Sequence, residues 1–274
     1  MTFAKKFYAT LMSYNTKNDP FDEEEHNIAD YYFNYSDYEI LFPRNEKRSD
    51  TAIMNQRKVL QNKLLNIDKL IYSRVKQFNL NHHWRPENIT SLIRPCDYNK
   101  GKVGWMCIRY GKTKYEVLEL NKGVLSKDEE FGFQKHACLQ FIIYKDGFDI
   151  SLFHAVPHDA IDRSYVHGKV LDNSFKRKLI NEIKSLKGNE FVWHITDSNT
   201  DERYAYNIDD ENPKYFIDFY NEYDMDGKES FLAFSLTPDD KKLKTINSLS
   251  KLILNKFSML LPLYSLIAYR PPQI

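Results

Sequence analysis

The stretch from His136 to Val156, HACLQFIIYKDGFDISLFHAV, constrains the fold of this chain more than any other part of the sequence. Two runs rich in β-branched and aromatic residues flank Asp146-Gly147, a dipeptide typical of two-residue hairpin turns with positive φ. A two-residue loop at that position also fixes which residues of the two strands face each other. The expected pairs on the apolar face are Ile143 with Ile150, Phe141 with Leu152, and Leu139 with His154. We therefore predict an antiparallel hairpin with one apolar face in the core and one mixed face.

Apolar residues recur every three or four positions in three other segments, 51–79, 173–187 and 239–260. This spacing predicts amphipathic helices. Ser49 or Asp50 is expected to cap the first helix, and Pro262 is expected to end or kink the last. A shorter helix is predicted after the central hairpin, with Pro157 in its first turn.

Strand patterns predict two further hairpins. Residues 103–110 and 114–120 flank Gly111-Lys112, and residues 214–223 and 230–236 flank Asp226-Gly227. With one more strand at 190–195, the chain has about seven strands, mostly antiparallel, flanked by amphipathic helices. That combination is an α+β fold. We expect residues 1–100 to form a mainly helical N-terminal extension and residues 101–274 the sheet domain, with a single domain over 1–274 as the alternative.

Composition indicates a soluble protein of the cytoplasm. The three cysteines, Cys96, Cys107 and Cys138, are spaced too widely for a disulfide framework or a zinc site, so we expect reduced thiols. The sequence has no apolar run long enough for a membrane span and no clear signal peptide. Its many Lys, Asn, Ile and Tyr residues suggest an AT-rich, bacterial genome.

Charge is unevenly distributed, although the net charge is only +1. Residues 19–39 contain eight acidic residues and no Lys or Arg, and acidic residues also dominate from 197 to 229. Basic residues collect on the predicted helices. Either pattern can be a simple solvated face, so charge alone does not define a site.

Two histidines and two aspartates follow the central hairpin, namely His154, His158, Asp159 and Asp162. Such side chains can hold a divalent metal or position a general base, so a metal-dependent hydrolase is one hypothesis. Their spacing does not favour it, because Pro157 separates the histidines and the predicted pairing places His154 on the core face. We therefore expect no metal and no other cofactor.

The remaining signal is basic. Lys176, Arg177, Lys178 and Lys184 lie on the helix predicted at 173–187, and Arg109 and Lys112 lie near the second hairpin. Together these residues could line a phosphate-binding surface. The sequence contains no Walker loop, dinucleotide fingerprint or nucleophile elbow, so no reaction is indicated.

The leading hypothesis is a bacterial cytoplasmic protein that binds nucleic acid or a phosphate-rich ligand through its basic helices. A role in phage defence or nucleic-acid processing would be compatible with it, but goes beyond the residues. The first alternative is a protein-interaction module, whose acidic, Tyr-rich segment near the N-terminus docks onto a basic partner or onto the protein's own basic helices. The second is the hydrolase. The sequence does not indicate the oligomeric state.

Overall fold

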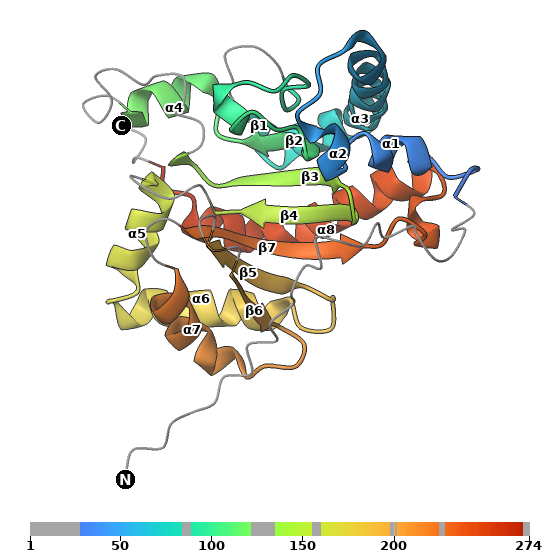
Figure 1. Cartoon of the computed structure of the whole chain (residues 1–274). Coiled ribbons are helices and arrows are strands. Elements are labelled where there is room, and N and C mark those ends of the chain that lie inside the picture. Colours follow the sequence, from blue (N-terminus) through green and yellow to red (C-terminus); the bar gives the residue numbers. More distant parts are fainter. Residues whose placement is uncertain are drawn as a thin grey trace.

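The structure is a computed structural model and describes residues 28–83, 89–121, 135–154, 160–197, 200, 202–224 and 228–270. Seven strands form one sheet in the order β1-β2-β3-β4-β7-β5-β6, and every neighbouring pair is antiparallel. Helices pack against this sheet (Figure 1). The predicted α+β fold with a seven-stranded antiparallel sheet is confirmed.

The central hairpin consists of β3 (Cys138–Tyr144) and β4 (Gly147–Phe153). Its loop is Lys145-Asp146, one residue earlier than predicted, so Ile143 faces Phe148 instead of Ile150. Each predicted partner is therefore wrong by two positions. Because side chains alternate with a period of two, this shift leaves the predicted apolar face intact. The side chains of that face are fully buried, namely Leu139, Phe141, Ile143, Phe148, Ile150 and Leu152.

Gly147 occupies the first position of β4 and does not have the positive φ that we predicted. A glycine is needed there for a different reason. A Cβ atom at this position would overlap the backbone carbonyl oxygen of Leu236, on the neighbouring strand β7 (Lys228–Leu236). Close approach of two backbones therefore explains this residue.

Two predicted strands are helices. Residues 114–120 lie in α4 (Lys114–Asn121), which begins with a capping box: the Thr113 hydroxyl accepts from the Glu116 amide, and the Glu116 carboxylate accepts from the Thr113 amide at 2.7 Å. The hairpin predicted around Gly111-Lys112 is therefore wrong.

Residues 214–223 also prove helical, in the 3₁₀ turn η3 (Pro213–Tyr215) and α7 (Phe216–Tyr223). The Asn212 side chain caps η3 by accepting from the Lys214 amide. The dense aromatic residues, which suggested a strand, recur at helical spacing and bury one side of α7. The predicted turn residues Asp226 and Gly227 lie outside the described residues.

Two short strands that we did not predict keep the strand number at seven. β1 (Asn81–His82) pairs with β2 (Trp105–Gly111) at one edge of the sheet, and β6 (Arg203–Asn207) pairs with β5 (Val192–Asp197) at the other. Both are rich in polar residues, so they lack the apolar signal of a central strand.

The three long helices are close to their predicted positions. α3 covers Thr51–Gln77, with the Asp50 side chain accepting from the Ile53 amide, and α6 covers Asn173–Ser185. α8 covers Ile246–Ile267 and continues through Pro262, contrary to its predicted end at residue 260. It also starts later than predicted, after the 3₁₀ turn η4 (Lys241–Leu243).

The shorter helices are α1 (Tyr35–Glu39), α2 (Pro43–Glu46), α5 (Ile161–Lys169) and the 3₁₀ turn η1 (Asp97–Asn99). α5 is the short helix predicted after the central hairpin. It begins at Ile161, and Pro157 lies outside the described residues.

α8 is the centre of the helical layer. It contacts β3 and β4 through its buried side, and it also contacts α3, α6 and α5 (Figure 1). α3 precedes the predicted domain boundary at residue 100, yet its buried side chains belong to the same hydrophobic core as those of the sheet. The division into an extension and a domain stays a prediction. None of the described helices is long and apolar enough to cross a membrane.

Candidate functional site

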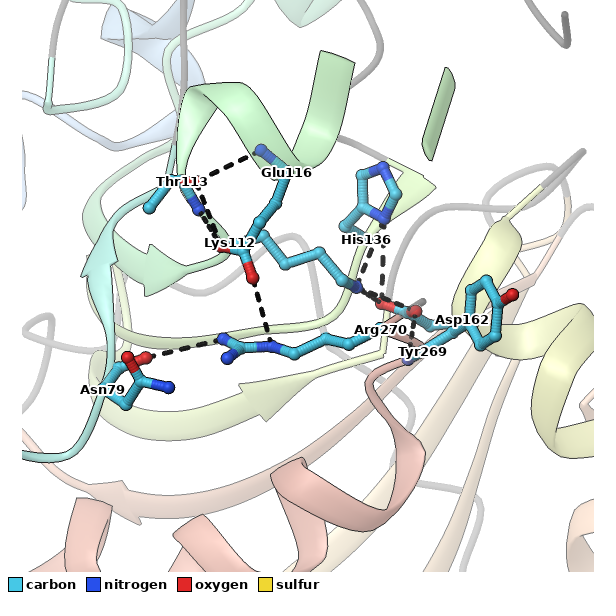
Figure 2. Close-up of polar contacts among 8 residues, drawn as sticks. All are labelled: Asn79, Lys112, Thr113, Glu116, His136, Asp162, Tyr269 and Arg270. Atoms are coloured by element: carbon cyan, nitrogen blue, oxygen red, sulfur yellow. Dashed lines mark hydrogen bonds and ion pairs between the residues drawn. The ribbon is translucent and has the colours of Figure 1, made fainter. Parts of the chain in front are cut away.

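Lys112 and Asp162 form a buried ion pair (Figure 2). We had predicted Lys112 as a phosphate-binding residue and Asp162 as a residue of the possible hydrolase site. Lys112 directly follows β2, and Asp162 lies in the first turn of α5. The Lys112 ammonium donates to both carboxylate oxygens of Asp162, at 2.9 and 2.7 Å, and both side chains are 0% exposed. Strand β2 is thereby joined to a helix 50 positions further along the chain.

Asp162 accepts two further hydrogen bonds, both from backbone amides. The Ala137 amide donates to Oδ2 at 2.6 Å, and the Tyr269 amide donates to Oδ1 at 2.7 Å. Burial raises the pKa of Asp162 and lowers the pKa of Lys112. All four of these hydrogen bonds come from N–H donors, however, so the ionised carboxylate is the form that satisfies them. The carboxylate thus holds β2, the start of β3 and the chain after α8 together.

His136 completes this buried cluster. Its Nδ1 lies 3.3 Å from the Lys112 ammonium, and burial together with that charge lowers the pKa of His136 to about 2. The imidazole is therefore neutral. Cys138, on the next strand position of the same face, is also buried, and burial raises the pKa of its thiol to about 12. A protonated thiol is a poor nucleophile, so this pair is not suited to covalent catalysis.

Arg270 lies at the rim of the cluster. Its guanidinium is 3.5 Å from the Glu116 carboxylate and 3.4 Å from the backbone oxygen of Asn79 (Figure 2). Glu116 and Arg270 are partly exposed, whereas Lys112, His136 and Asp162 have no exposed surface. A substrate has no access to the inner three side chains in this structure, so the arrangement is suited to holding the chain together.

Two other side chains of α5, Arg163 and His167, belong to a second polar cluster around Asp224. Arg163 donates to the Asp224 carboxylate at 3.0 Å, and His167 is 2.9 Å from the same oxygen. Burial alone would raise the pKa of Asp224, but the hydrogen bond from His167 and the charge of Arg163 lower it to about 2. His154 lies in the same region, fully buried, with its Nδ1 3.5 Å from the Tyr220 hydroxyl. Burial lowers the pKa of His154 to about 3, so this imidazole is neutral as well.

The structure describes two of the four residues of the hydrolase hypothesis, and it places these two in different clusters. His154 belongs to the Asp224 cluster and Asp162 to the Lys112 cluster, while His158 and Asp159 lie outside the described residues. In the part of the chain that the structure describes, no group of three or more His, Cys, Asp or Glu side chains is arranged to hold a metal ion.

Two of the predicted phosphate-binding residues are engaged inside the protein. Lys112 is buried against Asp162, as described above. Arg109 donates to the Gln140 side chain at 2.8 Å, and its guanidinium lies 4.8 Å from the ring centre of Phe153. Neither cation points freely into solvent.

The other four predicted phosphate-binding residues lie on α6. Arg177, Lys178 and Lys184 are exposed, and Lys176 is half-buried. Glu182, which is half-buried, is the one carboxylate within this helix. α6 packs against α8. α8 itself has one exposed cation, Lys251, because its Lys256 is buried and donates to the backbone oxygen of Asn189.

The outer side of α3 carries a longer basic surface, which we had not included among the candidate site residues. Lys58, Lys69, Arg74 and Lys76 are all exposed. Asp68 is the one carboxylate from residue 51 to residue 83, and it is buried, accepting from the Tyr110 hydroxyl at 2.7 Å. The sequence did contain a signal for this surface, namely the near absence of acidic residues along the whole helix, and we overlooked it.

α8 fills the space between α3 and α6 with an exposed stripe of mostly small polar side chains. This stripe consists of Asn247, Ser248, Lys251, Asn255, Ser258, Pro262 and Ser265. No Asp or Glu occurs in α8. We call the exposed sides of α3, α8 and α6 together the helix-layer surface. It carries eight exposed Lys and Arg residues, Lys58, Lys69, Arg74, Lys76, Lys251, Arg177, Lys178 and Lys184.

No protein-family model matches the sequence, and no curated protein shows significant similarity to it.

Proposed function

We propose that this protein binds the phosphate backbone of nucleic acid through the helix-layer surface. The observation that carries this proposal is the separation of charge on three adjacent helices. The helix-layer surface has eight exposed cations and one half-buried carboxylate, Glu182, whereas the one acid of α3, Asp68, is buried and accepts a hydrogen bond from the Tyr110 hydroxyl. A surface of this kind attracts polyanions and releases their counterions on binding.

Acidic residues outside these three helices account for the net charge of only +1. Asp209, Asp210 and Glu211 follow β6, and Asp218 and Glu222 lie on α7. α7 packs against α6, so its two acidic residues lie next to the α6 part of the helix-layer surface.

The described part of the Tyr-rich acidic segment packs onto the protein itself. The Asp37 carboxylate pairs with Lys63 of α3, and the Tyr32 hydroxyl donates to the Lys63 backbone oxygen at 2.7 Å. In these contacts Lys63 neutralises the Asp37 carboxylate, and the four exposed cations of α3 remain available. The Asp37–Lys63 pair is also the kind of contact expected of an acidic segment that docks onto the protein's own basic helices, so the interaction module remains the alternative.

The test is fluorescence anisotropy with labelled DNA and RNA over a range of salt concentrations. We expect the triple variant Arg177→Glu, Lys178→Glu, Lys184→Glu to bind more weakly to every sequence. Its log–log salt slope should be smaller by about 2 to 3, since each phosphate contact contributes about 0.9 to the slope for duplex DNA. A variant with the same charge change outside the helix layer, Lys114→Glu, Lys145→Glu, Lys214→Glu, serves as the control.

The proposal fails if the wild-type protein binds none of the nucleic acids at low salt, or if the control variant loses as much affinity as the α6 variant. Thermal melting of both variants shows whether the fold is preserved. A cytoplasmic location is part of the proposal, and the three cysteines support it because all of them are free thiols.

A further inference from the structure

We infer that RNA bound to the helix-layer surface is cleaved there, with His82 as the general base and Asp68 as the residue that positions it. This inference rests on the proposed function and goes beyond it by assigning an activity and a class of substrate. It comes from the pair that the two side chains form where strand β1, at the edge of the sheet, meets α3.

The imidazole of His82 is held in one orientation by its neighbours. Its Nε2 atom lies 2.8 Å from the Asp68 carboxylate, which also accepts from the Tyr110 hydroxyl at 2.7 Å. The Tyr72 ring stacks on the imidazole, with 3.8 Å between the ring centres and 16° between the ring planes. A carboxylate can only accept hydrogen bonds, so Nε2 carries the proton and Nδ1 keeps the lone pair that a general base needs.

The Nδ1 atom of His82 is open to solvent. The His82 side chain is 22% exposed, and within the described part of the chain no group forms a hydrogen bond with Nδ1. This atom is also not one of the buried side-chain nitrogens and oxygens that lack a partner among the described residues. The pair thus combines a buried carboxylate with an imidazole nitrogen that a substrate can reach.

The charge around Asp68 favours proton transfer to His82. Among the described residues, the hydrogen-bond partners of the Asp68 side chain are a tyrosine hydroxyl and His82, and neither is a permanent cation. The negative charge of Asp68 can therefore stabilise the imidazolium that forms when Nδ1 takes a proton. The similar pair of His167 and Asp224 differs in this respect, because Arg163 already neutralises Asp224.

Lys76 connects this pair to the helix-layer surface. Lys76 is one of the exposed cations of α3, and its ammonium lies 5.8 Å from the centre of the Tyr72 ring. The same ring stacks on His82. A phosphodiester that is attracted to Lys76 is therefore brought close to the imidazole.

The reaction that these groups support is a transesterification within the RNA backbone. Nδ1 of His82 takes the proton of a ribose 2′-hydroxyl, the 2′-oxygen bonds to the adjacent phosphorus, and the bond from phosphorus to the next 5′-oxygen breaks. That 5′-oxygen takes a proton from water, and the resulting hydroxide takes the proton back from His82. The products are a 2′,3′-cyclic phosphate end and a 5′-hydroxyl end. RNA is the substrate because it carries the nucleophile next to the reacting phosphorus, whereas DNA does not.

Incubation of the wild-type protein with labelled single-stranded RNA at low salt, in the presence of a metal chelator, tests the activity. We expect fragments that end in a 2′,3′-cyclic phosphate, identified by mass spectrometry, and no cleavage of DNA with the same base sequence. An RNA with a single 2′-deoxyribose should resist cleavage at that position, because the attacking hydroxyl is missing there. RNA that is bound but stays intact would overturn this inference and leave the proposed function standing. Absence of binding to both RNA and DNA would overturn the proposed function as well.

Substitutions test which residues carry the reaction. His82→Ala should lower the cleavage rate at least about 100-fold and leave the affinity for RNA unchanged, since the exposed cations are intact. Free imidazole should restore part of the lost rate. Asp68→Asn should lower kcat and leave KM unchanged, because it disturbs the orientation of the base and not the binding of RNA.

The control is His167→Ala, which removes the imidazole of the other pair and should cleave RNA like the wild type. If His82→Ala does not fold, His82→Gln replaces it and the same loss of cleavage is expected. Wild-type cleavage by a folded His82 variant would show that the reaction does not use this imidazole, and the inference would be wrong.

Discussion

Replacing Asp162 tests whether its carboxylate holds three separate parts of the chain together. The change Asp162→Leu leaves the buried Lys112 ammonium without its anionic partner, with the neutral His136 as its remaining contact, and loss of one partner of a buried ion pair typically costs about 3–5 kcal/mol. It also leaves the Ala137 and Tyr269 amides unsatisfied, at about 1–3 kcal/mol each. Lys112→Met removes only the cation and leaves the carboxylate with its two amide donors. We therefore expect Asp162→Leu to destabilise the protein more than Lys112→Met.

The double variant Lys112→Met, Asp162→Leu separates this arrangement from an ordinary ion pair. A buried pair replaced by apolar residues is often neutral for stability. Here the two amides remain unsatisfied, so the double variant should stay at least about 2 kcal/mol less stable than the wild type. Guanidinium unfolding followed by circular dichroism at pH 7 measures all three values. Wild-type stability of the double variant would refute the reasoning. If Asp162→Leu does not fold, Asp162→Asn provides the graded measurement, because it keeps one acceptor oxygen.

Three other predictions concern the hairpin and the second polar cluster. Gly147→Ala should destabilise the protein by about 1–3 kcal/mol, because the added Cβ meets the Leu236 carbonyl oxygen. The control is Gly168→Ala, where a Cβ meets no neighbouring atom and no destabilisation is expected. Equal melting temperatures for the two variants would exclude this steric explanation. His154 stays neutral when folded, with a pKa of about 3, but takes up a proton near pH 6.5 when unfolded. The buried His154 therefore lowers the free energy of unfolding as pH falls from about 6.5 towards 3, by about 1.4 kcal/mol per pH unit. His154→Leu should flatten this pH dependence, which guanidinium titrations from pH 7 to 4 measure. Asp224 has the opposite sign: its pKa of about 2 stabilises the fold above about pH 4, and this contribution is lost as pH falls towards 2. Asp224→Asn should thus cost at least about 2 kcal/mol at pH 7, and a difference from wild type that stays the same at pH 2.5 would contradict the assignment.

Local patterns predicted much of this fold correctly. The stripe of α3 and the alternation of β3 and β4 could be read from the sequence, because each depends only on residues within the same element. At 114–121 we predicted a strand and the structure has a helix. The information for the helix was also local, since the capping box at Thr113 and Glu116 was present in the sequence. Our prediction of a strand there did not take this cap into account.

The candidate surface was partly predictable. The exposed cations of α6 followed from amphipathicity, which places charged residues opposite the apolar stripe. That α8 lies between α3 and α6 did not follow, because the relative positions of helices far apart in sequence depend on how their apolar sides fill the sheet face. The helix-layer surface exists only as a consequence of that packing.

The sequence by itself therefore determined the class of fold, the long helices and which faces of the central hairpin are buried. Tertiary structure decided the pairing of the hairpin, where the Leu236 backbone approaches Gly147, and the fate of the charged residues. Lys112 and Asp162 are 50 positions apart. On the basis of residue type, we had predicted that Lys112 could bind phosphate and that Asp162 could bind a metal ion. A buried charge needs partners that can come from anywhere in the chain, whereas periodicity reports only on neighbours. For that physical reason the burial of Lys112 against Asp162 could be learned only from the folded protein.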